Sequence, residues 1–147
     1  MATVFHSGSV PSQVTRASTF DQPAYQGYVA LYVGFVILPI VAGFDKFFDV
    51  LTNWDTYLAP IVTQWLGMNA HPIMLVVGVI EIIAGLIVLF RPQIGAYIVG
   101  VWLLGIIANL LLHGGAYDIV LRDVGLAVAA FALARISAEF NPRPIGV

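Results

Sequence analysis

The stretch PIMLVVGVIEIIAGLIVLF, residues 72–90, decides the fold. All nineteen residues are apolar or small except one, Glu81, which stands at the centre. As an α-helix the stretch is about 28 Å long, close to the hydrocarbon thickness of a bilayer. We therefore predict that it crosses a membrane.

Glu81 is the exception that needs an explanation. A carboxyl group at the middle of a bilayer is costly, so by default it marks a functional site or a specific packing contact. Residues on its helical face are small, namely Gly78, Ala84 and Gly85. Small residues mark the faces on which membrane helices approach each other closely. We expect Glu81 to point into a helix bundle.

The whole composition is that of an integral membrane protein. Of the 147 residues, 60% are hydrophobic and 10% are charged, whereas a soluble domain carries about 25% charged residues. The net charge of −2 gives no reason to expect a nucleic-acid partner. Because the chain has no cysteine, disulfides, thiol catalysis and cysteine-ligated clusters are excluded.

Proline and glycine divide the chain into an all-α, integral membrane four-helix bundle over residues 23–140. Pro92 ends one span, and Gly114 and Gly115 end the next. Pro39 is expected to kink the first span, and Asp118 to cap the last. The predicted spans cover residues of about 25–46, 72–90, 93–112 and 118–138.

The connection between the first two spans, residues 52–71, contains apolar residues at helical spacing and three aromatic residues suited to the headgroup level. It reads as a short interfacial helix lying on the bilayer. An ordinary loop packed on the bundle is an equally good interpretation.

Two polar tails flank the bundle, residues 1–22 and residues 141–147. The first tail has no apolar segment typical of a signal peptide, so the first span is expected to act as an uncleaved targeting signal. A polar tail is ordered only when something holds it, and we expect a neighbouring subunit or a lipid surface to do so. The Lys and Arg balance is four against two in favour of cytoplasmic termini: Arg16, Arg91, Arg135 and Arg143 against Lys46 and Arg122.

Counting residues from the ends of the spans selects partners for Glu81. Trp102 is level with it on the third span, where the indole N–H can donate to the carboxyl group. Lys46 lies about 10 Å further out along the first span. We expect Glu81 to be either neutral or paired with Lys46. Asn109 shares a small and polar face with Trp102, and we place that face inside the bundle.

Small residues also predict a close-packing seam on the last span, formed by Gly125, Ala129 and Ala132. Gly125 lies near the level of Glu81. We therefore expect the backbone of the last span to approach the carboxyl group at this point.

A second polar cluster is predicted at the outer side of the bundle. Two histidines and several carboxylates near one interface are a donor set that a metal ion accepts. No H-x-x-H or E-x-x-H pair stands on one helix, so we expect helix capping and hydrogen bonding, without a metal. Arg122 is expected to pair with Asp118, four residues earlier. The cluster comprises Asp45, Asp49, His71, His113, Asp118, Arg122 and Asp123.

Three segments resemble the DoxX-like family of small four-span membrane proteins: GFDKFFDVL (43–51), VGVIEIIAGLIVLFRP (77–92) and DVGLAVAAFALARIS (123–137). The resemblance covers about residues 27–140. It implies a four-helix membrane bundle, sometimes associated with quinone-linked redox systems, with Lys46 and Glu81 at the family-like charged positions. The chain departs from the family in its longer polar N-terminal tail and in its connection 52–71, which fit docking onto a partner.

The resulting functional hypothesis is a non-catalytic accessory subunit of a larger respiratory or photosynthetic membrane complex. Its expected partners are membrane lipids and other membrane subunits. No intrinsic cofactor is expected, and a lipid or a quinone is the expected bound molecule. One alternative is a DoxX-like subunit of a quinone-linked oxidoreductase in which Glu81 handles protons. Another is a stand-alone protein that binds a lipid or a small hydrophobic ligand.

Overall fold

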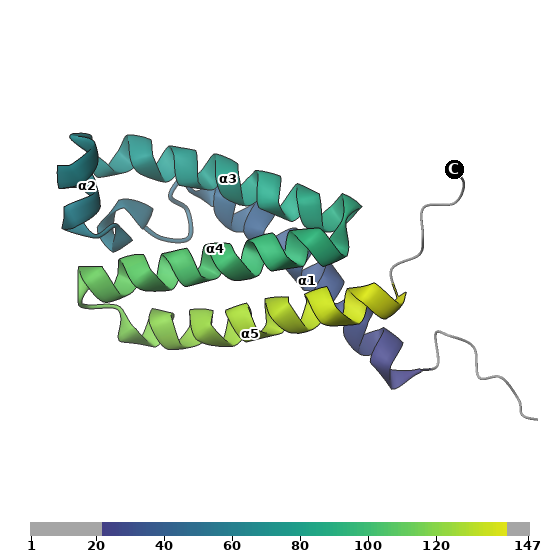
Figure 1. The fold of residues 1–147 in the computed structure, drawn as a ribbon. Coiled ribbons are helices and arrows are strands. Elements are labelled where there is room, and N and C mark those ends of the chain that lie inside the picture. Colours follow the sequence, from purple (N-terminus) through teal and green to yellow (C-terminus); the bar gives the residue numbers. More distant parts are fainter. Residues whose placement is uncertain (1–21, 141–147) are drawn as a thin grey trace, which may run out of the picture.

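The computed structural model describes residues 22–140, and all regular structure within them is helical (Figure 1). This part of the chain confirms the all-α prediction. The predicted tails lie outside the described residues, except for Gln22. The elements are α1 (Pro23–Asp45), the 3-10 helix η2 (Trp54–Tyr57), α2 (Pro60–Leu66), α3 (Ala70–Phe90), α4 (Pro92–His113) and α5 (Tyr117–Phe140).

Three of these helices, α1, α3 and α4, are long and apolar enough to cross a membrane. They confirm that the sequence has the character of a membrane protein. The fourth long helix, α5, has 24 residues but differs in composition. It carries five charged side chains, namely Asp118, Arg122, Asp123, Arg135 and Glu139.

The ends of the helices follow local chemistry. Proline stands in the first turn of α1, α2 and α4, where its missing N–H costs nothing. Gly67 and Gly114 end α2 and α4 in the left-handed conformation, with φ of 62° and 76°. α5 begins one residue earlier than predicted, so Asp118 lies in its first turn and is not the capping residue. α1 continues as a helix through Pro39.

The long helices pack in two close pairs, α1 with α3 and α4 with α5. α3 and α4 are joined by a tight turn at Arg91–Pro92, and we call this the hairpin end of the bundle. From there they diverge toward the opposite end, where η2 and α2 lie, which we call the α2 end (Figure 1). α1 and α5 both extend beyond the hairpin, and the rings of Tyr25 and Phe140 meet there with centroids 5.6 Å apart.

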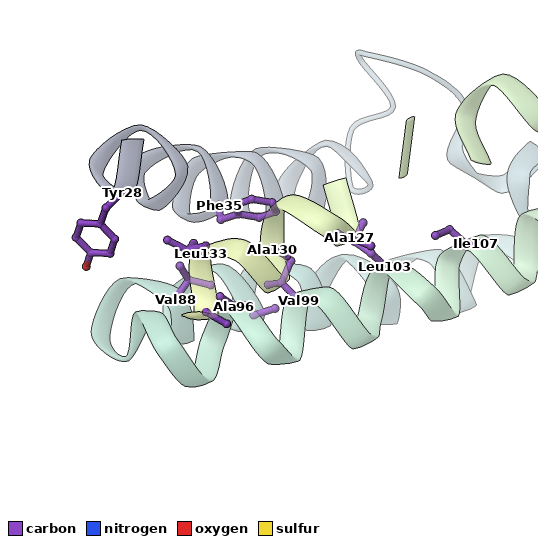
Figure 2. Packing of buried hydrophobic residues seen from close by; sticks show 12 residues of the cluster. Tyr28, Phe35, Val88, Ala96, Val99, Leu103, Ile107, Ala127, Ala130 and Leu133 are labelled. Atoms are coloured by element: carbon purple, nitrogen blue, oxygen red, sulfur yellow. The ribbon is translucent and has the colours of Figure 1, made fainter. Parts of the chain in front are cut away.

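The apolar core lies between the two pairs (Figure 2). Small side chains let α5 approach α4 closely, and Leu133 and Ala130 are completely buried. The small-residue seam predicted on α5 was wrong at Gly125, whereas Ala129 is partly buried and packs against the core. Gly125 faces open space, because α5 is rotated so that another set of residues points inward: Asp123, Ala127, Ala130, Leu133, Ala134 and Ser137.

The small and polar face of α4 that was predicted to lie inside the bundle is also placed differently; it contains Gly95, Ile98, Trp102, Gly105 and Asn109. Gly95 is buried, but Ile98 and Gly105 are exposed beside the diverging α3. The residues that α4 buries belong to the neighbouring face that packs on α5. This difference follows from the divergence of α3 and α4, which leaves the predicted face along a groove.

α1 ends partway along α3. Lys46, which caps α1, lies beside Glu81, and Glu81 lies eleven residues into α3. At 1.5 Å per residue, about 16 Å of α3 extends beyond this point toward the α2 end. The connection 46–59, including η2, occupies this space and packs against α3.

Candidate functional site

Two glycines bring α1 and α3 together. A Cβ atom added to Gly43 would lie 2.5 Å from the carbonyl oxygen of Gly78, and one added to Gly78 would lie 2.7 Å from that of Gly43. Only glycine permits this approach of two backbones. Lys46 and Glu81 each follow one of these glycines by three residues, which places them on the same contacting faces.

The crossing produces a buried ion pair. Lys46 Nζ lies 2.6 Å from Glu81 Oε2, and the two side chains are 3% and 9% exposed. Of the two states that the sequence left open for Glu81, the structure shows the paired one. The predicted offset of about 10 Å was wrong, because α1 is displaced along α3 until its glycine meets Gly78.

Trp54 closes the ion pair on the side of the connection. Lys46 Nζ lies 3.8 Å from the centre of its indole ring, a cation–π contact. The indole N–H donates a hydrogen bond of 2.7 Å to Asp45 Oδ2. Trp54 thus covers the Lys46 ammonium group, and Asp45, the residue before Lys46, holds the indole ring in place.

Asp45 also organises the turn that follows α1. Its carboxylate accepts hydrogen bonds from the backbone N–H groups of Val50, at 3.2 Å, and Leu51, at 3.1 Å. Asp49 adopts a φ of 50° within this turn. Non-helical backbone at membrane depth is tolerated where protein groups satisfy it. Asp45 supplies such groups at the end of α1.

Asn109 performs the same task from α4. Its side-chain oxygen accepts a hydrogen bond of 2.9 Å from Ala59 N–H, and its amide donates one of 2.8 Å to Tyr57 O. Sequence reasoning grouped Asn109 with Glu81 and Trp102. The structure instead shows Asn109 bound to the connection between α1 and α2.

Trp102 stands between Glu81 and the groove along α3 and α4. Its ring lines the groove, while its indole N–H is buried and directed at the Glu81 carboxyl group, close enough to act on it. The predicted interaction of the indole N–H with Glu81 is therefore present, although the two groups form no close hydrogen bond. On the α5 side, the buried Asp123 carboxylate is near enough to repel Glu81 and is paired with Arg122 at 2.9 Å.

The predicted outer cluster divides into separate groups. Asp45 and Asp123 are buried beside the ion pair, whereas Asp49 and Asp118 are exposed. The predicted pairing of Arg122 with Asp118 was wrong, because the desolvated Asp123 carboxylate takes the guanidinium instead.

The two histidines of this cluster also lie apart. His71 contacts Asp55 at 3.2 Å, and the Nδ1 atom of His113 is buried without a partner. Among residues 22–140, no three His, Asp or Glu side chains gather closely enough to hold a metal ion.

The groove between α3 and α4 has a volume of about 410 Å³ and opens sideways. Helices α3 and α4 both line it, on the face where they diverge. The sequence did not predict the contact of Trp54 with Lys46, because this contact depends on how the connection folds back. The shape of the groove depends on how α3 and α4 diverge. The lining residues are Ile80, Ala84, Tyr97, Ile98, Val101, Trp102 and Gly105.

Comparison with known proteins gives no family assignment beyond these observations. No protein-family model, no curated protein and no solved structure matches the chain. The ion pair of Lys46 and Glu81, enclosed by Trp54 and Trp102, is the candidate site that the structure itself identifies.

Proposed function

We propose that this chain is a non-catalytic accessory subunit of a membrane complex. In this proposal α5 is the fourth span, α2 lies at the membrane interface, and both termini are cytoplasmic. The charges of α5 are compatible with a span because Asp123 is buried and paired, while Asp118 and Glu139 lie near its ends. Lys and Arg near the ends of a span reach the interface through their long side chains.

The observation that carries the proposal is the buried ion pair of Lys46 and Glu81, which joins α1 to α3. Lys46 is held by Glu81, by Trp54 and by the carbonyl of Ala42 at 3.5 Å. A buried ion pair of this kind is a device for specifying one arrangement of helices more than a source of stability. The Lys46–Glu81 pair sets where α1 stops on α3, which supports a role in building and holding an assembly.

The context of a respiratory or photosynthetic complex comes from the DoxX-like resemblance and not from the contacts within the chain. Lys46 and Glu81 are the residues shared with that pattern. Their pairing supports the resemblance at one point, the charged positions of the first two spans.

Replacing Glu81 tests the proposal. Glu81→Gln keeps the size of the side chain and a hydrogen-bond acceptor but cannot carry a negative charge. We expect the variant to weaken co-purification of partner subunits from native membranes and to lower thermal stability. Quinone-linked turnover per assembled complex is expected to stay within twofold. Glu139→Gln, the same change at an exposed position of α5, is the matched control.

A second candidate is favoured by one observation, the buried indole N–H of Trp102 that faces the Glu81 carboxyl group. A donor beside a buried carboxylate suits a site where a proton arrives and leaves, as in a quinone-linked oxidoreductase. In that case Glu81→Gln lowers turnover by orders of magnitude while the complex stays assembled. That result would replace the accessory role by the proton-handling one.

The topology has its own test, since the chain contains no cysteine. Single cysteines are introduced as Gln64→Cys, Gly115→Cys, Gln93→Cys and Glu139→Cys, and intact cells are treated with a membrane-impermeant maleimide. We expect residues 64 and 115 to be labelled from outside and residues 93 and 139 only after lysis. Equal labelling of residues 115 and 139 would show that α5 does not cross.

A further inference from the structure

The groove between α3 and α4 has the dimensions of one leaflet of a bilayer. It extends from Tyr97 to Gly105, eight residues of α4 or about 12 Å. Half the hydrocarbon thickness of a bilayer is about 15 Å. Tyr97 lies five residues after the start of α4 and Gly105 thirteen, so the groove runs from about 8 Å to about 20 Å from the hairpin end.

The walls of the groove suit a hydrocarbon chain. All the lining side chains are aliphatic or aromatic apart from the glycine, and the polar atom of Trp102 is turned away and buried. Gly105 leaves a notch, since a Cβ atom added there would meet nothing within 4 Å. A linear acyl chain needs no polar partner along such a surface, whereas a polar ring leaves its carbonyl groups unpaired there.

The turn at the hairpin end, beyond the groove, carries a cationic side chain. Arg91 occupies the turn between α3 and α4, is exposed, and forms no ion pair with any residue from 22 to 140. Tyr97, the nearest groove residue on α4, follows it by six residues, or about 9 Å. Arginine is well suited to phosphate because its planar guanidinium donates two parallel hydrogen bonds.

We propose that this groove is a binding site for an anionic phospholipid. The phosphate lies on Arg91, and one acyl chain runs along the groove over Tyr97 to Trp102 and Gly105. Along the helices, the positive charge comes first and the apolar walls follow, in the same order as the phosphate and the acyl chain of a lipid. The length of the groove is close to the thickness of one leaflet. This inference goes beyond the accessory role and stands on different residues.

Quenching of Trp102 fluorescence tests the site directly, because Trp102 lines the groove. The chain has only two other tryptophans, and both can be replaced. Trp54→Phe and Trp65→Phe leave Trp102 as the single fluorophore in the full-length chain, reconstituted in nanodiscs. Phosphatidylglycerol or phosphatidylcholine with brominated acyl chains is titrated into the bilayer. We expect the anionic lipid to quench at a mole fraction at least threefold lower than the zwitterionic lipid.

Two variants separate headgroup from chain. Arg91→Gln is expected to remove the preference for the anionic lipid. Gly105→Leu is expected to fill the notch and to reduce quenching by both lipids. Gly125→Leu on α5, where an added side chain also meets open space, is the matched control and is expected to change neither.

Native mass spectrometry of the unsubstituted chain gives a readout that does not depend on replacing Trp54. We expect one phosphatidylglycerol to remain bound after detergent removal, and fewer in Arg91→Gln. Equal quenching by both headgroups, or retention unaffected by Arg91→Gln, would overturn the proposal. Quenching of Trp102 by a quinone at mole fractions where neither brominated lipid quenches would assign the groove to a quinone instead and would also overturn it.

Discussion

At the α1–α3 seam, two glycines place the backbones in contact and the ion pair of Lys46 and Glu81 follows one turn later. At the α4–α5 seam, alanine, valine and leucine side chains fill the space and no charged pair crosses between the helices (Figure 2). An apolar seam that slides by one turn still buries apolar surface. A seam with a buried ion pair loses both charge partners when it slides, so it permits a single register.

The largest effect is expected from breaking the ion pair on one side. Lys46→Met leaves Glu81 buried without its partner, and the free energy of unfolding in micelles is expected to fall by about 3–5 kcal/mol. Combining Lys46→Met with Glu81→Leu is expected to restore most of this loss. Denaturant titrations followed by circular dichroism measure both. A double variant no more stable than the single one would mean that the charges are not coupled.

Truncating a side chain of the α4–α5 seam provides the comparison with the ion pair. Here no second substitution is expected to restore the lost stability. Leu133 is completely buried, and Leu133→Ala is expected to lower the free energy of unfolding by about 3 kcal/mol through the cavity it leaves. Leu121→Ala, at a position of α5 that is 75% exposed, serves as the control in the same titration. Similar losses in the two variants would show that α5 is not packed as described.

Adding one methyl group where Gly43 meets Gly78 tests the contribution of the close backbone contact while both charges of the ion pair are kept. Gly43→Ala is expected to lower the free energy of unfolding by about 2 kcal/mol, because the new Cβ meets the Gly78 backbone. Gly34→Ala lies on the same helix where an added Cβ meets nothing within 4 Å, and it is expected to be neutral or slightly stabilising. Thermal unfolding of the two variants side by side gives the comparison, and equal melting temperatures would contradict the close crossing.

The smallest expected effect concerns the polar connection that completes the α1–α3 pair. Asn109→Leu removes two hydrogen bonds to residues 57 and 59, with an expected loss of about 1–2 kcal/mol. Hydrogen exchange at the Ala59 amide is expected to accelerate while the α3 amides keep their protection. Unchanged exchange at Ala59 would mean that Asn109 does not hold the connection.

The sequence was sufficient for much of the fold. Apolar length, Pro92 between two spans and Gly114 at a helix end placed the long helices to within a few residues. Small residues around Glu81 correctly predicted its inward direction, since Gly78, Ala84 and Gly85 are all buried. These features act within one helix, so one sequence is enough to read them.

Relations between helices were harder to predict. Counting depth from the helix ends assumes that all spans begin at the same surface, and the contact of Gly43 with Gly78 overrides this assumption. The rotation of α5 likewise depends on burying Asp123 and not Gly125. Trp54 reaches Lys46 through a turn with a positive φ at Asp49, a path with no periodic pattern in the sequence.

The stopping point of α1 beside the middle of α3 has a consequence for biosynthesis. In the proposed topology, translation delivers Lys46 before Glu81 exists, and an unpaired lysine at mid-depth costs about 2.5–3.5 kcal/mol on insertion scales. We therefore expect the end of the first span to stay nearer the aqueous boundary until the second span emerges and supplies its counter-ion. Final depth is acquired late, so a nascent chain arrested before residue 81 should hold residue 46 in a more hydrated place than the finished protein does.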